Sequence, residues 1–291
     1  MDKKHKMRIR IRKMGFVWMA LAGSLALASC QSGAEQEETA EALYAEAEEA
    51  FKDGRDTVAL QLIDSINRAC PKAFDTRQKG VDLKKKVIIT QAQETIALAD
   101  SIRLRLEEEA KALQSGLKLQ KNARYEDDGN YLAPSQLEEN NTGRSYLRAQ
   151  VSESGHLQLT SVARSGAALK HTSVRVAAGG QSAATGEGHV FPYGTARKVD
   201  YQEDKAAGKV AAFIAEHEGE NIRMEFVSGS GAVAIPLTAA DRKAIAQVYR
   251  YYEKRKEIAG LQKKAEEAWV KIRFYTEKSA QRRPPHTAKE Q

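Results

Sequence analysis

Apolar residues recur at steps of three and four along two long stretches, which predicts two long helices. In residues 87–117 the recurring positions are Ile88, Ala92, Ile96, Ala99, Ile102, Leu106, Ala110, Leu113 and Leu117. The second stretch begins after Thr238 and Asp241, which form a capping-box signature. Its recurring apolar positions are Ile245, Val248, Tyr252, Ala259, Leu261, Ala265, Ala268, Ile272 and Tyr275. This spacing is typical of a coiled-coil seam. We expect the two seams to cover each other as an antiparallel pair within one chain. The alternative is a homodimer, in which each seam pairs with a second copy.

A shorter helical pattern lies before them, at residues 39–75. One apolar stripe holds Leu43, Ala47, Ala50 and Phe51, and a second holds Val58, Leu62, Ile66 and Ala69. The turn Asp53-Gly54-Arg55-Asp56 separates the two stripes, and Pro71 ends the second. The pattern resembles one tetratricopeptide (TPR) helical hairpin. The small residues of that family correspond to Ala47 and Ala59, its turn glycine to Gly54, its bulky apolar residue to Ile63 and its terminal proline to Pro71. Leu43 stands where that family usually has Trp. One hairpin is too short for a solenoid, which needs at least ~3 repeats, so we expect it to pack on the next helix or on a partner.

Alternating residues between the two long helices predict a small β-rich head at residues 143–236. Leu147, Ala149 and Val151 lead into a turn at Ser154-Gly155, which predicts a hairpin that returns through Leu157 and Leu159. Further strands are expected at Val174 and Val176, at Val199 and Tyr201, and on both sides of Gly229-Ser230-Gly231, with a loose loop over residues 179–188. Val210, Phe213, Ile214 and His217 have helical spacing, which predicts a short helix over residues 209–218 that ends at Gly219. In all we expect five to seven short strands.

The predicted fold class is therefore α+β: an N-terminal TPR-like hairpin, two long antiparallel coiled-coil-like helices and an inserted β-rich head. The expected segments are a leader (1–29), a flexible tether (30–38), the hairpin (39–75), a long helix (76–122), a linker (123–142), the head (143–236), the C-terminal long helix (237–279) and a disordered tail (280–291).

The leader is a basic cluster followed by an apolar run from Met14 to Ala28. The end of this run and the next two residues form the sequence Leu27-Ala28-Ser29-Cys30. It resembles the signal peptides of bacterial lipoproteins. The resemblance implies cleavage before Cys30, lipid on Cys30 and attachment to a membrane. Gln31 stands where Asp favours the inner membrane in that family. The implied location is thus the outer membrane of a Gram-negative cell, facing the periplasm or the cell surface. The apolar run is shorter than the ~20 residues of a spanning helix.

Removing the leader changes the charge. The chain has a formal charge of +7 with 46 Lys and Arg against 39 Asp and Glu, and seven of the bases but one of the acids precede Cys30. The part from Cys30 onward therefore has 39 basic and 38 acidic residues, a formal +1. A nearly neutral chain gives no support to nucleic acid as a partner.

Motifs for catalysis, cofactors and metals are missing from the sequence. There is no phosphate-binding G-x-x-x-x-G-K-[ST], no H-E-x-x-H and no paired C-x-x-C. His156, His171, His189 and His217 all lie in the head, but their spacing favours separate histidines over a metal site. Ser161 or Ser165 could pair with one of them as a nucleophile, and Glu203-Asp204 are adjacent carboxylates; turns and solvated loops explain both patterns more simply. We therefore predict no catalytic, cofactor-binding or metal residue and no cofactor.

Two further features bear on function. Phe191-Pro192-Tyr193-Gly194 places Phe191 and Tyr193 on a predicted rigid turn, where exposed rings would stack on a glycan or peptide; core packing is the simpler alternative. Cys70 has no intramolecular partner if Cys30 is lipidated. It is expected to be a buried thiol, with an exposed reactive thiol as the alternative.

The sequence favours a lipid-anchored envelope protein that acts as a non-enzymatic structural or protein-interaction factor. One alternative is a glycan- or peptide-binding surface lipoprotein that uses the head, and a second is a hydrolase with a site in the head.

Overall fold

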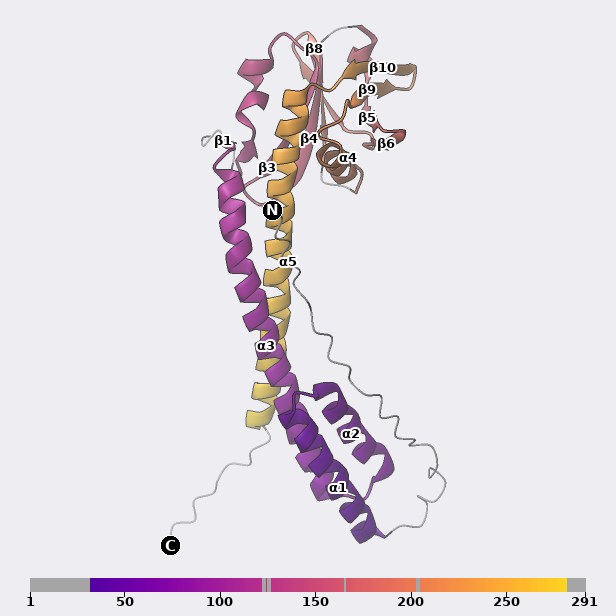
Figure 1. The fold of residues 1–291 in the computed structure, drawn as a ribbon, viewed down its shortest axis with the longest axis vertical. Helices are drawn as coiled ribbons and strands as arrows, with labels where there is room; N and C mark the ends of the chain where they lie inside the picture. The colour runs from indigo at the N-terminus through magenta and orange to yellow at the C-terminus, as the bar shows by residue number, and fades with distance from the viewer. Residues whose placement is uncertain (1–31, 122–123, 125–126, 165, 203–204, 282–291) are drawn as a thin grey trace, which may run out of the picture. The chain divides into compact units, whose positions relative to one another are not determined.

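The computed structural model describes residues 32–121, 124, 127–164, 166–202 and 205–281. These residues form the predicted α+β fold, in which long helices accompany two antiparallel sheets (Figure 1). The chain divides into two compact units, one ending at Ile88 and the other starting at Ile89, and each is described by itself. Cys30 and the leader lie outside the described residues.

The first unit is a helical hairpin covered by a third helix. Helices α1 (Gly33–Lys52) and α2 (Asp56–Ala69) are joined by a turn in which Gly54 has a positive φ of 71°, a conformation that favours glycine. The start of α3 (Phe74–Gln114) packs on both of them. Their shared core contains Ala47, Ala50, Ala59, Ile63, Leu83 and Val87. The first predicted stripe, the turn and the packing on the next helix are therefore confirmed. The second stripe is wrong in part, because α2 buries Ala59, Ile63 and Ile66, whereas Val58 and Ala69 are exposed.

The predicted flexible tether at residues 30–38 is wrong from Gly33 onward, because α1 already begins there. Ser32 and Glu35 cap it reciprocally, each side chain bonding the other residue's backbone N–H. The acidic side chains then dock on the start of α3: Glu37 accepts hydrogen bonds from the Thr76 N–H at 2.8 Å and from its hydroxyl at 2.6 Å. These contacts satisfy backbone groups at a helix start, which composition alone does not predict.

In the second unit, the rest of α3 packs antiparallel against α5 (Ala239–Gln281), and Figure 1 shows the two helices side by side. The Lys254 Nζ atom pairs with Glu109 Oε2 at 2.7 Å across them. Leu106 and Ala110 of α3 share a core with Val248 and Ile258 of α5. Near the head the two seams thus cover each other within one chain, as favoured from the sequence, although the predicted seam position Ala259 is exposed. The first long helix ends at Gln114 rather than residue 122, and the second extends to Gln281 rather than residue 279.

Ten strands form two antiparallel sheets in the described residues. The six-stranded sheet has the order β1 (Lys118–Gln120), β2 (Asn130–Leu132), β3 (Tyr146–Ser152), β4 (Leu157–Ala163), β8 (Ala196–Tyr201) and β7 (His189–Tyr193). The four-stranded sheet has the order β10 (Gly231–Pro236), β9 (Arg223–Ser228), β5 (Ser173–Ala178) and β6 (Gln181–Ala184). Helix α4 (Lys205–Glu216) and three short 3₁₀ helices, η1 (Pro134–Gln136), η2 (Glu138–Asn141) and η3 (Gly166–Lys170), complete this part. We call the two sheets with α4 and the 3₁₀ helices the head.

The predicted hairpins are confirmed. Val151 pairs with Leu157 on either side of the Ser154-Gly155 turn, where Gly155 has a φ of 94°. Strands β9 and β10 pair across the glycine-containing turn that ends at Gly231. The core side chains of β3, namely Leu147, Ala149 and Val151, are buried together with residues of α3, α4 and α5, so one core joins the head to the helix pair.

Three predicted boundaries of the head are wrong. The supposed linker at residues 123–142 contains β2, the supposed helix end contains β1, and the supposed loose loop at residues 179–188 contains β6. Each of these strands has only three or four residues, too few to show alternation. The short helix also starts earlier than predicted, at Lys205, and ends at Glu216. In the described part of residues 143–236 there are eight strands, β3 to β10, rather than the five to seven expected.

Candidate functional site

A groove lies where α3, α5 and the β3–β4 turn meet. Its volume is about 760 Å³, and all of its lining residues belong to the second unit. Its polar lining comes from Glu107, Lys111 and Gln114 of α3, from Ser154 and His156 of the turn, and from Arg255, Lys256 and Gln262 of α5. Ala110, Ile258 and Ala259 supply apolar surface, and Tyr251 and Tyr252 lie at its base. The volume falls in the range of small-molecule sites, roughly 300–1,000 Å³.

Helical spacing positions the cations of the groove over its tyrosines. Arg255 follows Tyr251, and Lys256 follows Tyr252, by four residues, so each pair lies on one face of α5. The Arg255 guanidinium lies 5.8 Å from the centre of the Tyr251 ring and donates to the Tyr251 hydroxyl at 3.0 Å. The Lys256 ammonium lies 5.4 Å from the centre of the Tyr252 ring. Both tyrosine rings are buried, so they form a rigid base for the two cations.

The β3–β4 turn is held in place by its own hydrogen bonds and by α5. Ser154 donates from its backbone N–H to Asp128, and its hydroxyl contacts the same carboxylate and His156 Nδ1. These hydrogen bonds lower the pKa of the Asp128 carboxyl. The Arg255 Nη2 atom donates to the backbone oxygen of Glu153 at 2.9 Å. The turn that carries Ser154 and His156 is thus tied directly to the groove's arginine.

The structure pairs Ser161 with a histidine, one of the combinations considered from the sequence. Ser161 Oγ lies 2.7 Å from His171 Nε2 and 2.9 Å from the Tyr201 hydroxyl, and His171 Nδ1 lies 2.7 Å from the backbone oxygen of Ala168. Burial lowers the pKa of His171 to about 4 and raises that of Tyr201, so the imidazole is neutral and the phenol keeps its proton. The Tyr201 hydroxyl therefore donates to Ser161, Ser161 donates to Nε2, and the Nδ1–H donates to Ala168.

This Ser161–His171–Tyr201 chain is a structural network and not an open nucleophile. Ser161 and His171 are fully buried, and Tyr201 is 3% exposed. Ser161 and Tyr201 belong to the six-stranded sheet, whereas His171 precedes β5 of the other sheet and packs edge-on against Phe226 at 4.8 Å. The network thus joins the two sheets by polar contacts in the core. Ser165, Glu203 and Asp204 lie outside the described residues.

The remaining head histidines have separate neighbours. His156 contacts Ser154, the His189 ring lies 4.5 Å from that of Phe191, and His217 bonds Glu220 at 2.8 Å. No group of three or more His, Cys, Asp and Glu residues that could hold a metal ion occurs in the part of the chain that the structure describes. In the groove, His156 contacts Ser154, and Glu107 pairs with Arg103 at 2.6 Å.

The predicted rigid turn at Phe191–Gly194 is wrong, because residues 189–193 form β7, and the turn begins only at Gly194, which has a φ of 57°. Strand β7 is an edge strand of the six-stranded sheet. The Phe191 side chain is 41% exposed, so the core-packing alternative does not hold for it. The Tyr193 side chain lies outside what the structure describes.

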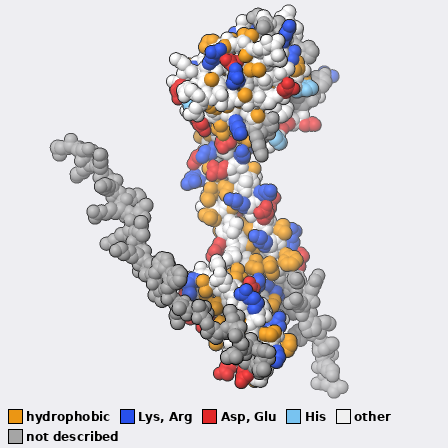
Figure 2. Space-filling view, turned by 90° about the vertical axis from the view of Figure 1, so that its right-hand side faces the viewer, with side chains coloured by type: hydrophobic (Ala, Val, Ile, Leu, Met, Phe, Trp, Pro, Cys, Tyr) orange, Lys and Arg blue, Asp and Glu red, His pale blue; other side chains and the backbone are white. Residues whose placement is uncertain are grey.

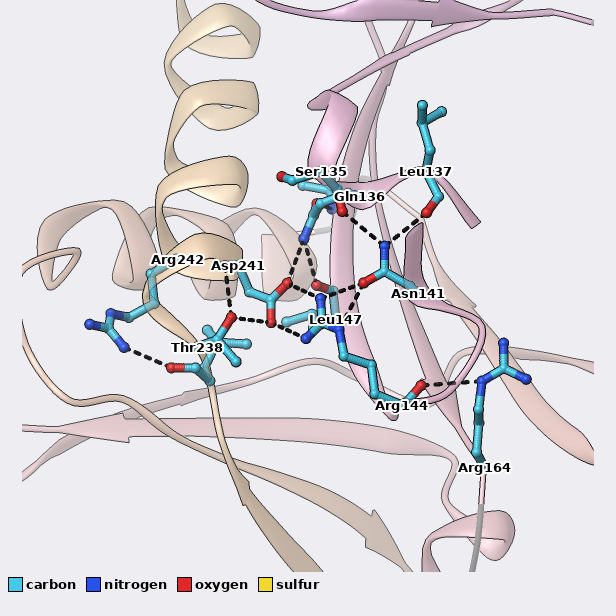
Figure 3. A network of polar contacts seen from close by, with 12 residues as sticks. Ser135, Gln136, Leu137, Asn141, Arg144, Leu147, Arg164, Thr238, Asp241 and Arg242 are labelled. Carbon is cyan, nitrogen blue, oxygen red and sulfur yellow. Dashed lines mark hydrogen bonds and ion pairs between the residues drawn. The ribbon is translucent and has the colours of Figure 1, made fainter. Parts of the chain in front are cut away.

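Figure 3 shows a second polar network, which sequence reasoning found only in part. Asp241 is only 2% exposed, and its backbone N–H donates to the Thr238 hydroxyl at 3.1 Å, as the capping signature predicts. Arg144 binds both carboxylate oxygens of Asp241, at 2.6 and 2.7 Å, and also bonds Asn141. Gln136 links β3 to this network through its hydrogen bonds to Leu147 and Ala149. The network fixes the start of α5 on the head.

The structure also shows the environment of Cys70 and several exposed apolar side chains. Cys70 is free and buried, which confirms the buried-thiol prediction. Trp269, Val270 and Phe274 of α5 stay exposed beside the buried seam. On the face of the molecule drawn in Figure 2, hydrophobic and charged side chains are interspersed over the head. No helix among the described residues is long and apolar enough to cross a bilayer.

Comparisons of the chain with protein-family models, with curated proteins and with solved structures give no match in any of the three.

Proposed function

We propose that this chain is a lipid-anchored envelope protein that acts through binding, as a non-enzymatic structural or protein-interaction factor. The anchor is the Cys30 sulfur, which follows Leu27-Ala28-Ser29 after a basic and then apolar leader. A second lipid chain on the same residue would make the attachment stable, because a single acyl chain holds a protein only marginally.

The observation that carries the proposal of binding is the contrast between the groove and the buried network. The groove is open and presents charged and hydrogen-bonding side chains from three segments of the chain. The Ser161–His171 pair, by contrast, is enclosed in the core, where a substrate cannot reach it without unfolding. An accessible surface of fixed polar groups suits recognition of a ligand or partner.

The location we propose is the outer membrane of a Gram-negative cell, facing the periplasm or the surface, because Gln31 follows Cys30. Metabolic labelling with an alkyne analogue of palmitate tests the anchor. The wild type and a Cys70→Ala variant should carry label in the outer-membrane fraction, whereas Cys30→Ala should carry none and keep its leader. Label that persists in Cys30→Ala would contradict the proposal.

Photo-crosslinking in intact cells tests the interaction. A photoreactive amino acid at Gln114 or Gln262 lies in the groove, whereas one at Glu266 of α5 lies outside it. We expect the two groove positions to give the same adduct and the control position to give none. Equal adducts from all three positions, or none from the groove, would count against a groove-based interaction.

The helical hairpin is a second contact surface in this proposal. We interpret α1 and α2 as one TPR-like unit because Gly54 makes the turn, and Ala47, Ala59 and Ile63 share one core. The unit serves a partner protein rather than a peptide groove, since a solenoid of several repeats is needed for the latter. A homodimer through the seams of the long helices stays an alternative, and light scattering of the purified protein over a range of concentrations measures it.

Glycan or peptide binding by the head is the alternative function, favoured by the exposure of Phe191 on the edge strand β7. An exposed ring stacks on sugars, and an edge strand has free backbone groups for an added peptide strand. Leu119 of the opposite edge strand β1 is a matched control, because it is 40% exposed against 41% for Phe191. Array binding that is lost in Phe191→Ala and kept in Leu119→Ala would support this function.

A further inference from the structure

We propose that the groove between α3, α5 and the β3–β4 turn binds a phosphate-bearing ligand, with Lys111, Arg255 and Lys256 as its anion contacts. The inference deepens the proposed interaction function by naming the chemistry that the groove recognises. A phosphorylated soluble molecule and a phosphorylated lipid head group share this chemistry.

Charge is concentrated in the groove although the chain from Cys30 onward is nearly neutral. The ionised side chains that line it are Lys111, Arg255 and Lys256 against the single carboxylate of Glu107. That carboxylate is already paired with Arg103, whose Nη1 atom lies 2.6 Å from Glu107 Oε1. Glu107 is therefore not free to neutralise the three cations of the groove. Holding like charges along one groove is unfavourable unless an anion lies between them.

Neighbouring carboxylates are engaged elsewhere. Glu109 pairs with Lys254 at 2.7 Å, and Glu153 pairs with Lys121 at 2.8 Å. The closest acid to Lys256 is Glu253, at 4.0 Å, a separation at which an exposed pair contributes little. Among the described residues, Lys111 and Arg255 have no carboxylate within 4.0 Å of their side-chain nitrogens, and the Asp128 carboxylate beside the groove contacts Ser154.

Arg255 is fixed in place without losing its charge. Both of its anchoring partners, the Tyr251 hydroxyl and the Glu153 backbone oxygen, are neutral. They hold the guanidinium plane over the buried Tyr251 ring and leave its other N–H donors for a ligand. A guanidinium held in this way can bind a phosphate through two parallel hydrogen bonds, at little further cost in side-chain entropy.

The number of cations and the size of the groove favour a phosphate ester over a simple carboxylate. A phosphate monoester carries a charge of about −2 near neutral pH, which suits one guanidinium and two ammonium groups better than a single negative charge does. The volume of about 760 Å³ leaves room for more than the phosphate itself. Ala110, Ile258 and Ala259 can cover the remainder of the ligand.

Calorimetry with the full chain tests the proposal. The probes are inorganic pyrophosphate, glucose 6-phosphate with glucose as its neutral counterpart, and phosphatidylcholine vesicles with and without phosphatidic acid. We expect the wild type to bind the phosphorylated probes and not their neutral counterparts, with affinity that falls as salt rises. Binding to glucose 6-phosphate alone would identify a soluble ligand, and binding to phosphatidic acid vesicles alone would identify a lipid head group.

Three variants separate the groove from charge in general. Lys111→Gln/Lys256→Gln removes two exposed ammonium groups and keeps the arginine, and Arg255→Gln removes the guanidinium. Lys263→Gln/Lys264→Gln removes the same charge from exposed positions of α5 outside the groove. We expect about ten-fold or greater weakening in the first two variants and little change in the third. Circular dichroism checks their folding, and the lysine variant gives the answer if Arg255→Gln does not fold.

Equal weakening in all three variants, or no binding of any phosphorylated probe by the wild type at low salt, would overturn the phosphate site. Neither result would alter lipid labelling at Cys30 or crosslinking from the groove, so failure of the phosphate site is distinguishable from failure of the proposed function.

Discussion

The buried His171 should make the stability of the head depend strongly on pH. Its imidazole is fully buried, and burial is the main reason that its pKa falls from 6.5 to about 4; the nearby Arg197 lowers it further, whereas the hydrogen bond to Ala168 acts in the opposite direction. The unfolded chain binds a proton near pH 6.5, and the folded chain does not until about pH 4. The contribution of the neutral His171 to the free energy of unfolding is therefore fully present above about pH 6.5 and is lost as the pH falls toward 4.

The expected magnitude follows from the shift. Each pKa unit corresponds to 1.36 kcal/mol, so a fall from 6.5 to about 4 amounts to about 3 kcal/mol at most. That is a large fraction of the stability of a typical domain, about 5–15 kcal/mol. Protonation would also remove the acceptor for the Ser161 hydroxyl and leave a charge among the side chains of both sheets.

Urea unfolding followed by near-ultraviolet circular dichroism measures this effect at a series of pH values. The comparison variant is His171→Asn, because its amide can still donate to Ala168 but does not titrate. We expect the wild type to lose about 3 kcal/mol more than the variant between about pH 7 and pH 4. The variant should be less stable than the wild type near pH 7, by about 1–3 kcal/mol, since Ser161 loses its acceptor. Parallel stability curves for the two proteins would refute the reasoning.

Three further predictions concern single residues elsewhere. Asp241→Ala should lower the free energy of unfolding in urea by about 2 kcal/mol or more, because the buried carboxylate both caps α5 and binds Arg144. Asp241→Asn keeps a capping oxygen and should lower it less. Equal losses in the two variants would contradict this account. Gly188→Ala should destabilise the head by about 1–3 kcal/mol, since a Cβ there would lie 2.6 Å from the Tyr201 ring. Gly208→Ala in α4 meets open space and should stabilise the protein by up to about 1 kcal/mol. Melting temperatures of the two variants that move in the same direction would contradict this expectation. The Cys70 thiol should react slowly with Ellman's reagent in the folded protein and quickly in urea, because burial raises its pKa; fast reaction without denaturant would show an exposed thiol.

The helices were predictable because their apolar periodicity extends over many turns. The seam positions Ala92, Ala99 and Leu106 are buried, and the cap at Thr238 and Asp241 forms. Strands β1, β2 and β6 were not predictable, because a three- or four-residue strand shows no period and depends on its neighbour for its hydrogen bonds. The start of α1 was missed although Ser32 and Glu35 form a local capping box; only the binding of its acidic residues to α3 depends on segments that are distant in the sequence.

The candidate site was less predictable than the fold. Tyr252 lies on the predicted seam of the last helix, and both it and Tyr251 are buried in the core that the helix shares with the head. The groove, however, needs α3, the β3–β4 turn and α5 in one place, and no local pattern shows that Arg255 reaches Glu153. Arg144 and Asp241 are likewise paired over a separation of 97 residues. The sequence signal that could have pointed to the groove is the pair of cations, Arg255 and Lys256, which follow Tyr251 and Tyr252 by four residues.

The shared core of α3, the sheets and α5 has a consequence for the order of folding. Leu106 leaves the ribosome well before Val248 and Tyr251, yet all three lie in the same core. The strands are synthesised first and must wait for the last helix, so their apolar faces need protection by a chaperone or by each other in the meantime. A chain that is cut short within α5 would therefore be expected to aggregate or be degraded rather than yield a smaller working protein.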